Sequence, residues 1–342
     1  MRNTVSLARQ VKEFCSRKGM DSLLIQGAGG NVSWKEGGTL WIKASGMWLA
    51  EAQSREIFVP VDLDALRQSI VVGKFDSAAR VIGDSTLRPS IETMLHALLP
   101  HRVVAHLHAV EVLSMLVREN SFEEAKSKLG QEANWLYVEY LKPGADLARG
   151  VYQGLFRCES ADIILLENHG IVVGADSVEA LEQRIDSVLS VMEQHQLNVF
   201  GGVDQGFLGP LEINARHYVV SSDDGVHCLA RDDRLLARLS LDWALYPDHV
   251  VFLGPRAWIW RDECSQQFEQ LATEEMPPFI FVAGRGVMEK VGVTEATRLQ
   301  LRCYRDVLLR QQPDTSLRNL AFSEVHALLE WDLEKYRKHL QS

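Results

Sequence analysis

Three histidines are the side chains of this sequence best suited to chemistry. His106 and His108 stand two residues apart in the segment VVAHLH, and His169 lies in the turn-forming segment Asn168-His169-Gly170. Residues two apart on an extended strand project from the same face, so the two imidazoles can approach one point, about 6–7 Å apart along the backbone. Three protein ligands with one open position is the arrangement of a catalytic zinc. The pair alone is also explained by histidines that hydrogen-bond within a sheet, and His169 favours the metal.

Glu92 is the carboxylate most able to cooperate with such a metal. It follows Ser90, which can cap a short helix that ends before Pro100. In the first turn of that helix, Glu92 can simply interact favourably with the helix dipole. Beside a metal, the same carboxylate can ligate the ion in the empty enzyme or act as a general acid or base when substrate is bound.

A glycine-rich loop, Gly27-Ala28-Gly29-Gly30-Asn31, can form a concavity of backbone N–H groups that holds an anion. A plain turn also explains it. It does not fit a dinucleotide fingerprint, because the third glycine of that pattern is missing and a hairpin is expected to follow. Ala44-Ser45-Gly46, at the end of the next strand, adds a hydroxyl group at the same edge.

The elements that must position these residues follow from hydrophobic periodicity. We expect an N-terminal helix with Leu7, Val11 and Phe14 on one face, closed by Gly19. The remaining elements, all expected from the sequence alone, are a hairpin over 32–46, a strand over 103–108, two strands over 162–173 and a helix with a capping box at Asp176 and Glu179. This is an α/β or α+β domain.

A segment with four glycines and a proline, Gly201 to Pro210, is the best candidate for a domain boundary. It divides the chain into a catalytic domain, 1–205, and a smaller C-terminal α/β domain of unknown role, 206–342. For the second domain we expect strands over 215–220, 250–252 and 279–283 and helices over 294–309 and 323–340. It shows no catalytic constellation.

Composition excludes several classes of function. The net charge of −10 and the pI near 5.6 oppose nucleic-acid binding. No stretch approaches eighteen consecutive apolar residues, so neither a membrane span nor a signal peptide is expected. The five cysteines are scattered without a paired motif, which is typical of ordinary thiols in a reducing cytoplasm. A cytoplasmic protein is therefore expected.

Five motifs taken together resemble the class II aldolase/adducin family. They are GAGGNVS (27–33), KASG (43–46), RPSIE (88–92), HLH (106–108) and NHG (168–170), and they occur in that family's order. The similarity covers about residues 5–200. Within the family, the chain is most similar to the aldolase portion of bifunctional rhamnulose-1-phosphate aldolase/alcohol dehydrogenases, and it shows no Rossmann fingerprint of a dehydrogenase half.

The resemblance implies a role for each matched residue. His106, His108 and His169 match the family's metal ligands, usually zinc, and Glu92 matches its acid/base carboxylate. The positions that match the substrate-phosphate site are Gly30, Asn31, Ser45, Gly46 and Ser90. Ile91 departs from the second serine of fuculose-phosphate aldolases, which weakens the match to phosphate. Tyr137 and Tyr140 are candidates for the family's tyrosine acid.

The resemblance also implies a fold and a reaction. The expected fold has three αβα layers around a mainly antiparallel sheet, in a homo-oligomer, commonly a tetramer. The implied reaction is cleavage or formation of a C–C bond in a ketose phosphate through a metal-stabilised enediolate. Decarboxylation, dehydration or 4-epimerisation of a related sugar or sugar-acid phosphate are alternatives, because family membership does not settle the reaction. A non-catalytic adducin-like interaction module is a further alternative, although decay of the site should have erased the histidines and Glu92.

Overall fold

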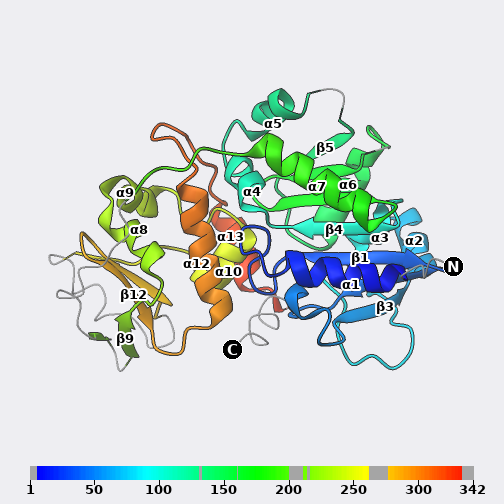
Figure 1. Ribbon diagram of the computed structural model, residues 1–342, viewed down its shortest axis with the longest axis horizontal. Helices are drawn as coiled ribbons and strands as arrows, with labels where there is room; N and C mark the ends of the chain where they lie inside the picture. The colour runs from blue at the N-terminus through cyan, green and yellow to red at the C-terminus, as the bar shows by residue number, and fades with distance from the viewer. Residues whose placement is uncertain are drawn as a thin grey trace.

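The computed structural model of the protein describes residues 6–130, 133–159, 161–199, 211–213, 216–261 and 276–332. Two β-sheets lie at opposite ends of the molecule, with helices between them (Figure 1). The larger sheet has the strand order β3-β2-β1-β4-β7-β6-β5. Its strands are β1 (Asn31–Glu36), β2 (Thr39–Lys43), β3 (Phe58–Asp62), β4 (Val103–Leu107), β5 (Trp135–Val138), β6 (Ile163–Leu166) and β7 (Gly170–Ala175).

Every strand pair in the larger sheet is antiparallel except β5 with β6. The predicted hairpin is formed by β1 and β2, and the two apolar runs around His169 are β6 and β7. The expectation of a mainly antiparallel central sheet is confirmed.

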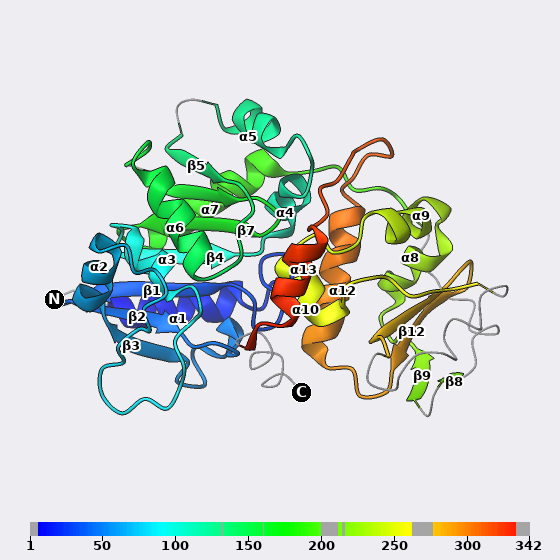
Figure 2. The same ribbon diagram turned by 180° about the vertical axis from the view of Figure 1, so that it is seen from behind.

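Helices cover both faces of this sheet, which gives the three expected layers (Figure 2). Helices α1 (Leu7–Lys18) and α7 (Val178–Met192) pack on one face, and α3 (Thr93–Leu98) and α6 (Ala145–Leu155) pack on the other. Strand β4 alternates between them: Val103 and Ala105 join the core below α1 and α7, whereas Val104 joins the core below α3. Since side chains alternate along a strand, His106 faces the same layer as α3.

The remaining helical elements of this part of the chain are α2 (Leu63–Val71), α4 (Val110–Leu116), α5 (Ser121–Leu129) and the short η1 (Leu49–Glu51). Two predicted caps are wrong. Ser90 does not cap α3: the helix begins at Thr93 with Glu92 as its N-cap, and the Ser90 hydroxyl accepts a hydrogen bond from the Glu92 N–H. Helix α7 is capped by Ser177 rather than Asp176, because the Ser177 hydroxyl accepts from the N–H of Ala180.

The C-terminal part carries a second, five-stranded sheet of order β10-β11-β12-β9-β8. Its strands are β8 (Leu211–Ile213), β9 (Arg216–Val220), β10 (Ile259–Trp260), β11 (Phe279–Val282) and β12 (Gly286–Lys290). Its helices are η2 (Asp224–His227), α8 (Cys228–Arg231), α9 (Asp233–Leu241), α10 (Pro247–Leu253), α12 (Glu295–Leu308) and α13 (Phe322–Leu329). The expectation of a second α/β unit is confirmed, while the boundary predicted at 205/206 lies outside the described residues.

Two expectations for the C-terminal part are wrong. The predicted strand over 250–252 is part of helix α10, whose start carries the helix-favouring proline Pro247. All of its residues are buried, so the apolar run lacks the periodicity that would mark a helix. Helix α13 ends at Leu329, so the single helix predicted over 323–340 is interrupted there, and the part of it over 333–340 lies outside the described residues.

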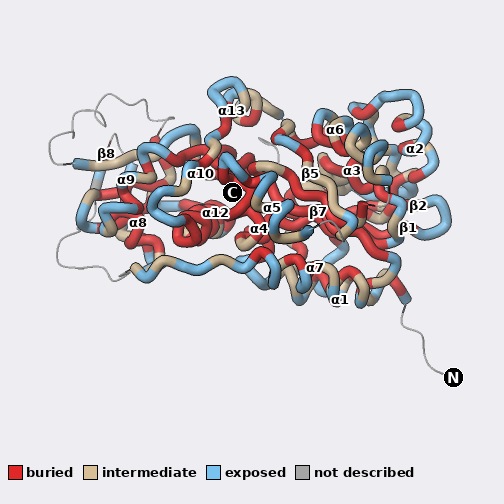
Figure 3. The backbone as a smooth tube through the Cα atoms, turned by 90° about the horizontal axis from the view of Figure 1, so that it is seen from above, coloured by how far each residue is buried: buried red, intermediate tan, exposed pale blue. Residues whose placement is uncertain are grey.

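Helices α10, α12 and α13 lie between the two sheets and join the halves of the molecule (Figures 1 and 2). Helix α4 belongs to the first part, yet Val110 and Leu113 are buried in the hydrophobic cluster of the C-terminal part. Arg310 follows the end of α12, and its buried side chain forms an ion pair with Glu111 of α4 at 2.5 Å. Buried residues of α10 and α12 lie between the two sheets (Figure 3).

Among the described residues, no helix combines the length and the apolar character that crossing a membrane requires.

The packing of α4 against the C-terminal part can be tested by mutation. Leu113 is fully buried in the cluster formed mainly by the C-terminal part. Replacing Leu113 with alanine should lower the free energy of unfolding by about 2–5 kcal/mol, because a cavity remains where the side chain packed. Urea denaturation followed by circular dichroism measures this change. Leu241→Ala, at a residue 69% exposed, is the control and should change little. Equal stability of the two variants would contradict the packing.

Candidate metal centre

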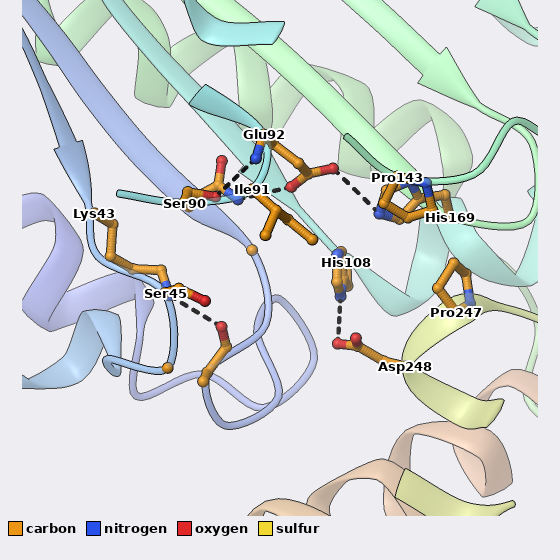
Figure 4. A pocket seen from close by; sticks show the side chains of 14 residues that line it. Lys43, Ser45, Ser90, Ile91, Glu92, His108, Pro143, His169, Pro247 and Asp248 are labelled. Carbon is orange, nitrogen blue, oxygen red and sulfur yellow. Dashed lines mark hydrogen bonds and ion pairs between the residues drawn. The ribbon is translucent and has the colours of Figure 1, made fainter. Parts of the chain in front are cut away.

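A pocket of about 400 Å³, counting the solvent at its mouth, contains most of the predicted site residues (Figure 4). It opens where the ends of β1, β2 and β4 meet the turn between β6 and β7. Its lining residues are Ala28, Gly30, Asn31, Lys43, Ser45, Gly46, Ser90, Ile91, Glu92, His108, Pro143, His169, Pro247 and Asp248. Pro247 and Asp248 come from the C-terminal part, so both halves of the chain form the pocket.

His106 and His108 turn their Nε2 atoms toward each other. These two atoms are 3.0 Å apart. Nδ1 of His106 donates a hydrogen bond to the carbonyl of Ile171 on the neighbouring strand β7, at 3.1 Å. Nδ1 of His108 lies 3.2 Å from a carboxylate oxygen of Asp248. With a proton on each Nδ1, facing these acceptors, each neutral ring would direct its Nε2 lone pair at the other ring.

This arrangement fits a bound cation. Two lone pairs at 3.0 Å repel each other unless a proton or a metal ion lies between them. Burial lowers the pKa of His106, which disfavours the proton. Ligand nitrogens of His106, His108 and His169 all lie within 4.8 Å of one another, so the three rings can hold one metal ion. Neutral imidazole is the form that ligates metals.

His169 and Glu92 complete the cluster. Nε2 of His169 lies 3.6 Å from Oε1 of Glu92, and Nε2 of His106 lies 3.4 Å from Oε2. Burial lowers the pKa of His169 to about 3, although the Glu92 carboxylate raises it. Burial also raises the pKa of Glu92, but His106, His169 and the Asn31 amide lower it, and the result is about 2. Glu92 is therefore a carboxylate as long as positive charge, from a proton or a metal ion, lies among these rings.

The two oxygens of Glu92 differ in their surroundings. Oε2 accepts a hydrogen bond from the Asn31 amide at 2.8 Å, whereas Oε1 is buried and accepts no hydrogen bond from the described residues. The Asn31 amide also bonds to Nε2 of His96, whose Nδ1 bonds to Ser33 at 2.7 Å. His96 was not among the predicted residues. A periodic apolar helix face gives no sign that one of its members contacts the Glu92 carboxylate through an asparagine.

The glycine-rich loop and the KASG segment also line the pocket, together with Ser90, which lies beside Glu92 (Figure 4). Gly30 has φ +59°, and a Cβ at this position would lie 2.7 Å from the carbonyl oxygen of His106. Only glycine fits so close to β4. The buried ammonium group of Lys43 donates to the carbonyls of Ala28, at 2.9 Å, and Met47, at 2.7 Å, and so ties the two loops together.

All five residues predicted to bind phosphate line the pocket, and so do Glu92, His108 and His169. Buried His106 belongs to the metal cluster without lining the pocket. Ile91 stands in the lining and contributes no hydroxyl group. The two tyrosine candidates do not line it: the hydroxyl of Tyr137 bonds to Ser121 and Glu167, and burial raises its pKa. Tyr140 is buried in the hydrophobic cluster of the C-terminal part.

Comparisons with protein families, with curated proteins and with solved structures show which proteins this chain is similar to. The model of the class II aldolase and adducin N-terminal domain matches residues 12–195, just over half of the chain. An uncharacterized oxidoreductase of Bacillus subtilis (strain 168), YuxG, is 30% identical over 221 residues, which are 57% of this chain and 32% of that protein. The chain therefore spans about a third of the length of this curated relative.

Two solved structures are similar to the first part of the chain. The N-terminal class II aldolase domain of a conserved protein from Thermoplasma acidophilum is 26% identical, with a TM-score of 0.48, over 56% of this chain and 97% of that one. YgbL from Klebsiella pneumoniae, described as a putative aldolase/epimerase/decarboxylase, is 20% identical, with a TM-score of 0.41, over 55% of this chain and 89% of that one.

The histidine cluster predicts stabilisation by metal. Zinc at about 100 times its dissociation constant should raise the free energy of unfolding by about 2.7 kcal/mol, because it binds only the folded protein. Thermal unfolding of chelator-treated protein, with and without zinc, measures the shift. His106→Ala should lose it, while His217→Ala, at an exposed histidine outside the cluster, should keep it. A wild-type protein whose unfolding ignores zinc would contradict the metal centre.

Proposed function

We propose a metal-dependent lyase reaction, from the premise that this chain belongs to the class II aldolase and adducin family. The protein would cleave or form a C–C bond in a ketose phosphate. One observation carries the proposal: three buried imidazoles converge with their ligand nitrogens within 4.8 Å, and the Glu92 carboxylate lies 3.4 Å from one ring and 3.6 Å from another.

In this proposal His106, His108 and His169 hold a divalent ion, which we take to be zinc because three imidazoles and an open position suit it. A metal bound there supplies a Lewis acid that favours negative charge on substrate oxygens as the neighbouring C–C bond breaks. The carbonyl of Ile171 fixes the tautomer of His106, so this ring presents Nε2 to the ion.

Glu92 moves the proton. Its Oε2 is fixed by the Asn31 amide, and its Oε1, which accepts no hydrogen bond from the described residues, is the atom that can take a proton from a substrate hydroxyl and return it. Hydrogen bonds from Ser33 to His96 and from His96 to Asn31 support the amide that holds the Glu92 carboxylate. Loss of this orientation would leave the charge present but misdirected.

The substrate phosphate would bind beside the glycine-rich loop and the KASG segment. Gly30, Asn31, Ser45, Gly46 and Ser90 line the pocket there, with two hydroxyl groups and flexible backbone. Because Ile91 supplies no hydroxyl, the serines on either side of the pocket carry more of the phosphate recognition. The Asn31 amide is engaged by Glu92 and His96, so Ser45 is the clearest side chain to test.

The proposal extends to assembly and location. By family resemblance the protein would form a homo-oligomer, commonly a tetramer. It would act in the cytoplasm, where small phosphorylated sugars are found. The family model matches residues 12–195, so the C-terminal part of the chain lies outside the matched region.

Glu92→Gln tests the proton transfer. The amide keeps the size of the side chain but cannot take a proton, so kcat for ketose-phosphate cleavage should fall by about 100-fold to 10,000-fold. A panel of ketose phosphates, assayed for aldehyde release with the metal content measured in parallel, gives the result. Glu123→Gln, at an exposed glutamate, is the control. Full cleavage by the Glu92 variant would defeat the assignment. An epimer from the panel, or carbon dioxide from a sugar-acid phosphate assayed beside it, would replace the aldolase assignment by an epimerase or a decarboxylase.

Ser45→Ala tests the phosphate end. A hydrogen bond to a charged group contributes about 1.5–3 kcal/mol, so KM for a phosphorylated ketose should rise about tenfold or more. The KM for the same sugar without phosphate should not change, since the lost hydroxyl has no partner there. Steady-state kinetics on both sugars, with exposed Ser54→Ala as the control, measure the difference. An equal rise in KM for both sugars would place the phosphate elsewhere.

A further inference from the structure

We propose that Asp248, from the C-terminal part of the chain, is a positioning residue of the metal centre. It would act through His108: its carboxylate fixes the tautomer and orientation of that ring, so that metal affinity depends on a half of the chain that the family model does not match. The inference rests on the proposed metal site. It adds Asp248 to the three histidines and Glu92.

The contact itself is short and fully buried. Oδ2 of Asp248 lies 3.2 Å from Nδ1 of His108, and both side chains are less than a tenth exposed. In Figure 4 Asp248 reaches this ring from helix α10, while Glu92 approaches the cluster from α3. An imidazole that donates its Nδ1 proton to a carboxylate presents a more basic Nε2 to a metal. His108 then matches His106, whose Nδ1 donates to a backbone carbonyl.

Asp248 is itself held in position. The side-chain amide of Gln300, on α12, donates to Oδ2 of Asp248 at 3.2 Å. Gly29 of the glycine-rich loop packs over the same contact: a Cβ there would lie 3.0 Å from Oδ2 of Asp248 and 3.1 Å from Nδ1 of His108. The loop, the histidine and the C-terminal helices therefore meet at one point, with little room for a further atom.

The same C-terminal segment also holds the turn that carries His169. Asn168 has φ +52°, and its side-chain amide donates to the carbonyls of Leu245 and Arg318, both at 2.7 Å. Residue 245 lies three positions before Asp248. Two of the three histidines are thus fixed from the C-terminal part, one through its ring and one through its neighbour in the chain.

Metal titration of Asp248 variants tests the proposal with zinc alone as the probe. Asp248→Ala should weaken zinc binding by about 10-fold to 100-fold, as expected for the partner of a metal-bound histidine. Asp248→Asn, which keeps the shape and an oxygen acceptor, should recover part of this loss. The matched control, Asp314→Asn, lies in an exposed loop and should bind zinc as the wild type does. Competition with a chromophoric chelator measures the affinities on full-length protein.

Two further measurements separate positioning from general damage to the fold. The metal-free variants should show wild-type circular dichroism, and the visible spectrum of the cobalt-loaded Asp248→Asn protein should shift, because the field of one ligand changes. Wild-type affinity and an unchanged cobalt spectrum in both Asp248 variants would overturn the proposal while the metal site stands. If the wild-type protein binds neither zinc nor cobalt, the proposed function fails together with it.

Discussion

Burying two imidazole lone pairs against each other costs free energy that only a shared cation offsets. In this protein Nε2 of His106 and Nε2 of His108 lie 3.0 Å apart, and both rings are buried, with His169 and the Glu92 carboxylate beside them. A buried unpaired charge is also unfavourable, so a divalent ion held by these residues would balance the carboxylate as well as the lone pairs. The other features of the site follow from the need to hold these groups in one place.

The fold meets this need by bringing distant segments to one end of the central sheet. Strand β4 supplies His106 and leads directly into His108, the β6–β7 turn supplies His169, and the N-cap position of α3 supplies Glu92. The Ile171 carbonyl and the Asp248 carboxylate lie against the Nδ1 atoms of His106 and His108, and the Asn31 amide donates to Glu92. Rigid strands and short turns place the ligands more precisely than long loops would.

The sequence predicted those parts of the site that local pattern determines. The two-residue spacing of His106 and His108 and the glycine-flanked turn at His169 indicated a metal centre, and the turn between two apolar runs predicted the β1–β2 hairpin. Asp248 and His96 could not be found this way, because each acts through a contact distant in sequence. Helix α10 was mistaken for a strand because it is buried on every side, although Pro247 at its start is a helix signal.

X-ray absorption spectroscopy of the zinc-loaded protein tests the central claim most directly. The account predicts a first shell of nitrogen and oxygen, including three imidazoles at about 2.0–2.1 Å, whose outer-shell scattering is diminished by one ring in His169→Ala. A first shell containing sulfur, or a spectrum identical in the wild type and in His169→Ala, would show that zinc binds elsewhere and would contradict the account.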